Sequence, residues 1–247
     1  MSSITQNPAG VPGGAGSSEE TAVRASDRAY EALREDIVEW RLLPGQVLGE
    51  VEQSERFGIS RTPIREALSR LTADGLTGAH RGRGVVVSQV SLEDVRALFE
   101  LREALDCRSA RLAARRGDPA GFHRLAAELE AVGARLPEQD TDRVGYYELV
   151  ERMDRAIDDA ADNPYLAAAQ RSLRLHLARV RKLSRADPQR LARAAAEHAQ
   201  IARAIAEGAE ELAEAATLVH LAHSLHSVLT TPVREWVRPA VPLEAAG

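Results

Sequence analysis

Cysteine is almost absent from this chain of 247 residues, and Cys107 is the only one. An intrachain disulfide, a CxxC metal site and an iron–sulfur cluster are therefore excluded. No run approaches the roughly 18 consecutive apolar residues that a membrane-spanning helix needs. The polar first 20 residues also lack the apolar segment of a signal peptide. We therefore expect a cytoplasmic protein with no membrane partner.

Aromatic residues are scarce as well, at 4%, but hydrophobic residues make up 44% of the chain and charged residues 28%. This is enough apolar material to build one large domain or two small ones. The net charge of -5 argues mildly against a nucleic-acid partner. The distribution of charge argues the other way, because residues 59–90 hold five arginines against two acidic residues. A short basic segment thus lies within an acidic chain.

The N-terminal part of the chain predicts three helices after a flexible tail over residues 1–21. An apolar pattern with helical spacing begins near Ala22 and ends before the turn at Pro44-Gly45. A second, short helix is expected over 50–57, where Gly58 ends it. Proline and glycine act here as local boundary signals.

The third helix, over 61–74, is the best defined. Ser60 or Thr62 is suited to cap it, and Pro63 lies in its first turn, where a missing N–H costs little. One apolar stripe is expected to face a core, and it consists of Ile64, Ala67, Leu68 and Leu71. After Gly75 the segments 76–80 and 85–87 predict a two-stranded hairpin.

From Ser91 onward no strand signal appears. Helices are expected over 92–115, 119–133, 142–161, 164–184, 187–206 and 209–230. The prolines at 119, 164 and 188 mark three of the breaks. The sequence therefore predicts a mainly α fold, with a winged helix-turn-helix over 22–88, an antiparallel all-α bundle over 91–230 and a tail over 231–247.

This layout gives the basic segment a function. Arg61 and Arg65 lie one turn apart on the side of the third helix that is opposite its apolar stripe. An α-helix fits the major groove of DNA, and an arginine there can bind guanine through two hydrogen bonds. Thr62 is suited to a phosphate or a thymine methyl group. The competing interpretation is that both arginines belong to the solvated face of a surface helix.

The remaining candidates for DNA binding flank that helix. The turn of the hairpin is expected to contact the DNA backbone or the minor groove, with Gly82 and Gly84 permitting a close approach. The candidates at these two places are Ser60, His80, Arg81, Gly82 and Arg83.

Several segments resemble a known family. GISRTPIREALSRLTADGLTGAHRGRGVVVS (58–88) and LREDIVEWRLLPGQVLGE (33–50) resemble the DNA-binding domain of the GntR family of bacterial transcription regulators. LFELREALDCRSARLAA (98–114), DNPYLAAA (162–169) and EHAQIARAIAEG (197–208) resemble the FCD effector domain of its FadR subfamily. The resemblance implies that Arg61, Thr62 and Arg65 contact an operator. Val51 is a departure, because the family often has a DNA-contacting arginine there.

The resemblance also implies a divalent metal in the bundle, held by an aspartate, a histidine four residues later, and two further histidines. His198 and His220 match the last two positions, but Val150 and Asp154 stand where the first pair belongs. Asp154, His198 and His220 would still form a two-histidine, one-carboxylate site for one Zn, Ni, Mn or Fe ion per subunit. The alternative is that metal binding has been lost.

Arg102 has two interpretations. The resemblance places it at the pocket, where a guanidinium would bind a carboxylate effector. An ion pair with Asp106, four residues further along the same helix, is the alternative.

Three functions are compatible with parts of this sequence pattern. The favoured one is a regulator, expected to be a repressor, that binds a palindromic operator in double-stranded DNA as a homodimer and responds to a small organic acid. A metalloenzyme built on Asp154, His198 and His220 lacks any supporting motif, so no enzymatic activity is predicted. A helical adaptor for another protein would not bind DNA.

Overall fold

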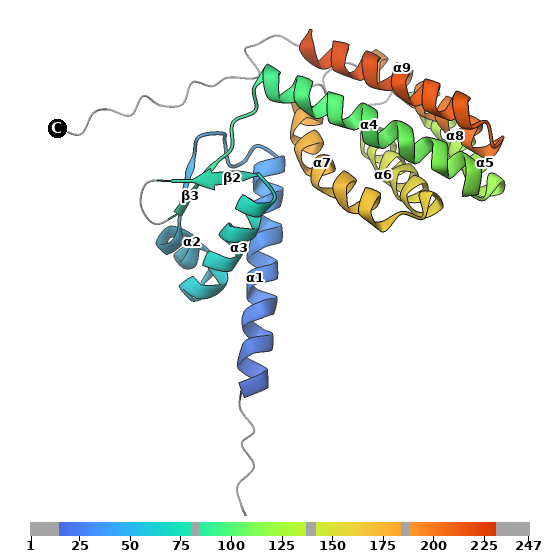
Figure 1. Ribbon diagram of the computed structural model, residues 1–247. Coiled ribbons are helices and arrows are strands. Elements are labelled where there is room, and N and C mark those ends of the chain that lie inside the picture. The colour runs from blue at the N-terminus through green and yellow to red at the C-terminus, as the bar shows by residue number, and fades with distance from the viewer. Residues whose placement is uncertain (1–14, 81–83, 137–141, 184–187, 231–247) are drawn as a thin grey trace, which may run out of the picture.

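The computed structural model describes residues 15–80, 84–136, 142–183 and 188–230. A small N-terminal unit and a larger helical bundle follow each other along the chain (Figure 1). The N-terminal unit consists of α1 (Ala15–Val38), β1 (Val47–Gly49), α2 (Glu50–Phe57), α3 (Arg61–Ala73), β2 (Thr77–Ala79) and β3 (Gly84–Val87). The expected helix-turn-helix with a β wing is thus confirmed.

The core of the N-terminal unit lies between α1 and α3. Leu33 and Ile37 of α1 are fully buried, and they share one apolar cluster with Ile64, Leu68 and Leu71 of α3. The stripe predicted for the third helix is therefore the face that packs. One boundary differs, because α1 begins at Ala15, inside the expected flexible tail. The composition of a segment rich in glycine and serine did not show where the helix starts.

The wing has three strands where the sequence predicted two. The order is β1-β3-β2, and both pairings are antiparallel. Gly84 has a φ of 143°, and a Cβ there would lie 2.4 Å from the carbonyl oxygen of Leu48. This glycine thus permits the close approach of β1 in the same chain, and its expected role in the approach to DNA stays a prediction.

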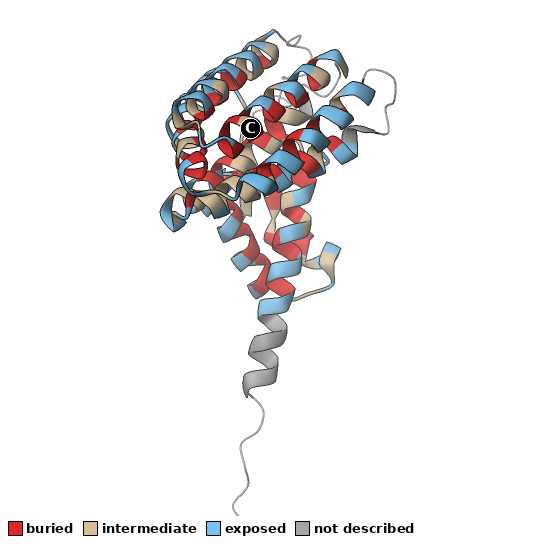
Figure 2. Ribbon diagram, turned by 90° about the vertical axis from the view of Figure 1, so that its right-hand side faces the viewer, coloured by how far each residue is buried: buried red, intermediate tan, exposed pale blue. Residues whose placement is uncertain are grey.

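The bundle consists of six helices among the described residues. They are α4 (Leu92–Arg116), α5 (Pro119–Arg135), α6 (Asp142–Ala161), α7 (Pro164–Leu183), α8 (Pro188–Ala206) and α9 (Glu210–Leu229). Their buried faces point inward (Figure 2). Small residues allow α5 and α8 to pack closely, since a Cβ on Gly133 would lie 2.9 Å from that of Ala195.

Polar residues define where these helices begin. Ser91 forms a capping box with Asp94, and the Asp118 side chain accepts hydrogen bonds from the backbone of Ala120 and Gly121 just ahead of α5. Asn163 does the same for α7. Caps of this kind depend on neighbouring residues, which explains why the expected bundle helices agree with the observed ones to within about two residues.

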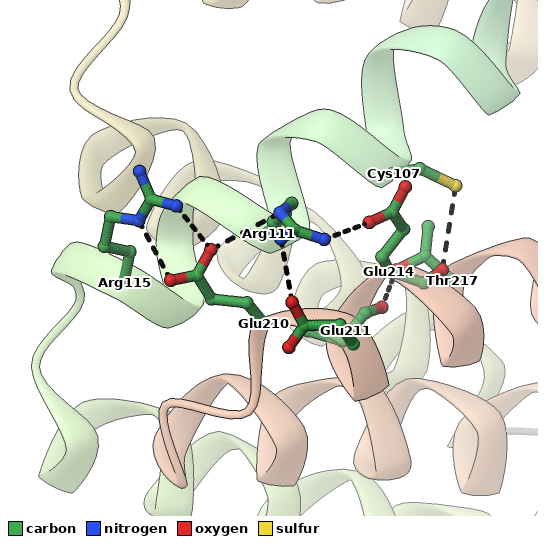
Figure 3. A network of polar contacts seen from close by, with 8 residues as sticks. Cys107, Arg111, Arg115, Glu210, Glu211, Glu214 and Thr217 are labelled. Carbon is green, nitrogen blue, oxygen red and sulfur yellow. Dashed lines mark hydrogen bonds and ion pairs between the residues drawn. The ribbon is translucent and has the colours of Figure 1, made fainter.

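An ion-pair network joins α4 to α9 along one side of the bundle (Figure 3). Arg111 binds Glu210, Glu211 and Glu214, and Arg115 binds Glu210. The buried Cys107 lies beside this network, with its Sγ 3.7 Å from the Glu214 carbonyl oxygen. The network therefore links the first and last helices of the bundle.

One bundle helix, α7, contacts the N-terminal unit (Figure 1). Arg179 is 1% exposed, and its Nη2 donates to the Ser88 carbonyl oxygen at 2.7 Å. The carbonyl oxygen of Arg179 accepts from the indole N–H of Trp40. Burial lowers the pKa of the Arg179 guanidinium to about 10.

In the described part of the chain no helix is long and apolar enough to cross a membrane.

Candidate functional site

The third helix presents the expected polar face. With Pro63 and Ile64 buried beneath it, the side chains of Arg61 and Arg65 remain 40% and 64% exposed. Thr62 and Ser60 are exposed beside them. Ser60 occupies the N-cap position, but its side chain makes no capping hydrogen bond. The N-terminal turn of α3 is thus available to a partner.

Both arginines are bound to a residue that the sequence analysis did not single out. Glu50, the first residue of α2, accepts hydrogen bonds from Arg65 Nε and Nη2 and from Arg61 Nη2, each at 3.0 Å. The hydrogen bonds from Arg65 and then from Arg61 lower the pKa of the Glu50 carboxyl to about 2. The sequence suggested that the two guanidiniums extend freely from the helix, but in the structure they do not. They are held side by side by one ionised carboxylate, whose side chain is 11% exposed.

The other DNA-binding candidates lie in the wing. His80 follows β2 and is exposed. Arg81, Gly82 and Arg83 lie outside the described residues. The structure therefore describes the three strands of the wing and His80, but not the turn between β2 and β3.

Three arginines of α3 have partly exposed side chains. Arg61 and Arg65 have partly exposed donors at the N-terminal turn, and Arg70, at the other end of the helix, is bound to Asp27 of α1. A helix with two exposed guanidiniums at its start has the shape and the donors needed for the major groove of DNA.

A cavity lies inside the bundle, with about 80 Å³ of water-accessible space. We call it the arginine cavity, because Arg102, Arg181 and Arg190 line it together with His198 and His220. Three aromatic residues, two serines and several aliphatic residues complete its wall, and none of its described lining residues is acidic. The aromatic residues and serines are Phe99, Tyr146, Tyr147, Ser224 and Ser227. A smaller cavity shares Arg102, Arg181 and both histidines, and Asp106 and Asp154 also line it.

The two buried histidines make hydrogen bonds to other side chains. His198 Nδ1 lies 3.1 Å from the Tyr146 hydroxyl, and His220 Nδ1 lies 2.7 Å from Glu197 Oε2. The second ring nitrogen of His220, Nε2, lies 3.4 Å from Ser224 Oγ. Burial lowers the pKa of His198 and that of His220, so both rings favour the neutral form.

The three expected metal ligands line the smaller cavity together, but they do not have the arrangement of a metal site. His198 and His220 are close, with ring centroids 4.2 Å apart, but Asp154 forms an ion pair with Arg174 at 3.6 Å. Within the described ranges, no three His, Cys, Asp or Glu side chains come together as a metal site. The residues present thus do not fit a divalent ion, because the carboxylate is bound to an arginine and the cavity is lined by guanidiniums.

Arg102 makes the expected pair with Asp106 and also lies at the cavity wall, while its binding of a carboxylate effector stays a prediction. Its Nε donates to Asp106 Oδ2 at 2.9 Å, which is the expected pair within one helix. It also lines both cavities and lies over the Phe99 ring. The Asp106 pair holds the guanidinium at the cavity wall.

Arg190 is a second residue that the sequence analysis missed. It is 9% exposed and lines the arginine cavity, and its Nη2 donates to Glu197 and to Ser224. Its Nη1 is buried without a hydrogen-bond partner. Its place in the cavity wall depends on how α8 packs against α9. Nothing in the local sequence distinguishes Arg190 from other arginines.

Comparisons with known proteins agree with this geometry. A family model described as "Bacterial regulatory proteins, gntR family" matches residues 25–87, and one described as "FCD domain" matches residues 97–223. The HTH-type transcriptional repressor RspR of Escherichia coli (strain K12) is 30% identical over 159 residues, which are 64% of this chain and 69% of RspR. The HTH-type transcriptional regulator LutR of Bacillus subtilis (strain 168) is 33% identical over 208 residues, covering 73% of this chain and 90% of LutR.

A third relative and two solved structures are similar over most of the chain. The probable D-xylose utilization operon transcriptional repressor of Paenarthrobacter nicotinovorans is 28% identical over 204 residues, covering 82% of this chain and 88% of its own length. E. coli McbR/YncC has a TM-score of 0.67 at 19% identity, covering 83% of this chain and 97% of that one. A putative GntR regulator from Rhodococcus sp. RHA1 has a TM-score of 0.63 at 24% identity, covering 83% and 98%. These two structures support the fold.

Proposed function

Because this chain belongs to the GntR family of bacterial regulatory proteins and carries an FCD domain, we propose that α3 reads a specific operator and that a small carboxylate bound in the bundle changes the affinity for it. The chain is a transcription regulator, and its relatives are regulators and not enzymes. Repression is the proposed direction, since two relatives carry the word repressor in their names.

The observation that carries this proposal is the pair of guanidiniums that Glu50 holds at the N-terminus of α3. Arginines fixed at this end of a recognition helix lie where base edges are contacted. Fixing them in advance reduces the conformational entropy lost on binding. The geometry therefore supports base recognition better than it supports a merely solvated surface.

A homodimer on a palindromic operator is part of the proposal. A single helix with two arginines contacts only a few base pairs, and one such module binds a small area of DNA. Two copies related by a twofold axis would contact two half-sites about one helical turn apart. The dimer accounts for useful affinity and predicts the symmetry of the operator.

The test is selection of binding sites from a pool of random DNA duplexes. We expect the wild-type protein to enrich a palindrome, with an affinity that falls steeply as salt rises. Arg65→Ala should lose the preference at one or two base pairs of each half-site, at about 1–3 kcal/mol for each lost contact. Its fold and dimer should be unchanged.

Arg70→Ala is the matched control, because it removes the same charge from the other end of α3. It should keep the wild-type sequence preference. An unchanged preference in Arg65→Ala would refute base recognition by this arginine. If the wild-type protein binds no duplex at all, the helical adaptor becomes the better hypothesis.

A further inference from the structure

We propose that the arginine cavity binds a small carboxylate directly through its guanidinium groups, with no metal ion between protein and ligand. The inference rests on the proposed function of the bundle as the effector domain, and it names the chemistry of recognition there. It also departs from the ligand set that the family resemblance implied. Three independent features of the cavity support it.

The first feature is charge. Arg102, Arg181 and Arg190 line the cavity, and no acidic side chain is among its described lining residues. Two carboxylates that contact its lining residues are already bound. Glu197 binds Arg190, His220 and His223, and Asp106 binds Arg102 and Gln170. A wall of this kind disfavours a divalent cation and favours an anion.

The second feature is the donor that lacks a partner. Arg190 Nη1 is buried and makes no hydrogen bond, while Nη2 of the same guanidinium is fixed by Glu197 and Ser224. Leaving a charged donor buried without an acceptor is unfavourable. Because Arg190 lines the cavity, a carboxylate oxygen that reached Nη1 would satisfy it, and the two contacts at Nη2 would hold the guanidinium in place.

The third feature is the state of the histidines. Both ring nitrogens of His220 are within hydrogen-bond distance of protein groups, and Nδ1 of His198 is paired with Tyr146. A metal ligand needs a free nitrogen lone pair directed at the ion. To bind a metal through Nε2, His220 would have to give up the Ser224 contact, since its Nδ1 is bonded to Glu197.

The size of the cavity limits the ligand. Its 80 Å³ of water-accessible space holds roughly five to eight water-sized groups. A carboxylic acid of two to four carbon atoms matches that space. The Tyr146 hydroxyl and Ser224 in the wall are suited to a second polar group, such as a hydroxyl or keto oxygen on the acid.

The experiment is isothermal titration calorimetry on the full chain, purified with EDTA and dialysed against metal-free buffer. The probes are acetate, glycolate, lactate, pyruvate, malonate and succinate, with inorganic phosphate and sulfate as other anions. We expect at least one carboxylate to bind without metal, and Arg190→Gln to weaken that binding at least tenfold. Arg152→Gln, at an exposed arginine paired with Glu128, is the matched control and should bind as the wild type does.

A second variant covers the case in which Arg190→Gln fails to fold. Arg190→Lys keeps the positive charge but not the two-nitrogen fork, and we expect it to fold and bind the acid several-fold more weakly. Circular dichroism and operator binding without ligand show that each variant is folded.

Three outcomes would overturn the inference: binding that requires added Zn²⁺, Ni²⁺ or Mn²⁺; binding of phosphate or sulfate but of none of the carboxylates; and unchanged acid affinity in folded Arg190→Gln. If no probe binds while the protein still selects an operator, this inference fails and the proposed DNA-binding function stands. If no operator is selected but an acid binds without metal, the proposed DNA-binding function fails and this inference stands.

Discussion

At the scale of single residues, the main difference from the sequence prediction is that Glu50 binds both arginines of the recognition helix. Sequence reasoning identified Arg61 and Arg65 from their spacing, but the acid that holds them lies on another helix, 11 and 15 positions away. Local patterns predict which face of α3 is polar. They do not predict which side chain from α2 meets it, because that depends on how the two helices pack.

We expect Glu50→Gln to reduce the preference for the operator over random DNA about tenfold, because Arg65 loses its charged acceptor. Binding to random DNA should be equal or slightly stronger, since one negative charge near the phosphates is removed. Competition gel shifts with operator DNA and with random DNA measure the two affinities separately. Glu52→Gln, an exposed acid on the same helix with the same change of charge, is the control and should keep the full preference.

The pKa of Glu50 also predicts a pH response. Its folded-state pKa of about 2 lies below the ordinary value of 4.5, so the stabilisation from its ion pairs is complete above about pH 4.5. That stabilisation is lost as the pH falls through about 2. Operator preference should therefore not change through Glu50 between pH 5 and 8, and a carboxyl titration by NMR checks this. A Glu50 pKa near 4.5 in the folded protein would contradict the ion-pair geometry.

At the scale of elements, the helices could be predicted and the smallest strand could not. Ser91, Asp118 and Asn163 act on the next few residues, so the sequence contains the information on where those helices start. β1 has three residues and exists because β3, some 37 positions later, pairs with it. No window of sequence around Val47 carries that signal.

Gly84→Ala should destabilise the wing. A Cβ at this position would lie 2.4 Å from the Leu48 carbonyl oxygen, and a φ of 143° is strained for any residue with a side chain. We expect a loss of about 1–3 kcal/mol in the N-terminal unit, seen as faster amide hydrogen exchange at β1 and β3. Gly78→Ala, in the neighbouring strand with nothing within 4 Å of its Cβ position, should be nearly neutral. Equal exchange in the two variants would contradict the pairing of β1 with β3.

The network between α4 and α9 gives a second prediction at this scale. Arg111→Gln removes three ion pairs shown in Figure 3, and a small fall in Tm is expected at low salt. The difference from wild type should disappear at about 1 M NaCl, where the Debye length is about 3 Å. The exposed Arg96 on the same helix provides the control variant, Arg96→Gln. A Tm difference that persists at high salt would show that Arg111 acts by packing and not by charge.

At the scale of the whole molecule, α7 is a helix of the bundle that also contacts the N-terminal unit. Leu177, Val180 and Arg181 line the arginine cavity, while Leu175 packs against the core of the N-terminal unit and Arg179 binds Ser88. Sequence analysis separated the chain into two domains but did not show which helix joins them, because the contacts of α7 are with residues more than 80 positions earlier. A ligand in the cavity therefore touches the same helix that supports the DNA-binding unit.

Arg179→Met tests this connection. The variant keeps an aliphatic stem in the buried site but loses the hydrogen bond to the Ser88 carbonyl oxygen. We expect this variant to bind the acid and the operator nearly as the wild type does. The acid should, however, change the operator Kd by less than about threefold, compared with the roughly 5- to 150-fold change that is typical of coupled sites. Fluorescence anisotropy of labelled operator measures the ratio of the Kd with acid to the Kd without it. Arg124→Met, on the exposed side of α5, should retain the full ratio, and so would Arg179→Met if α7 had no part in the coupling.

The end of the recognition helix also rests on α7. Gly75, with a φ of 73°, follows α3, and a Cβ there would lie 3.2 Å from the His176 ring. A larger residue there would strain the backbone at this positive φ, and the His176 side chain would have to move by a few tenths of an ångström. In a genetic screen for variants that bind the operator but no longer respond to the proposed carboxylate, we would examine codon 75 first, although it belongs to neither proposed binding site.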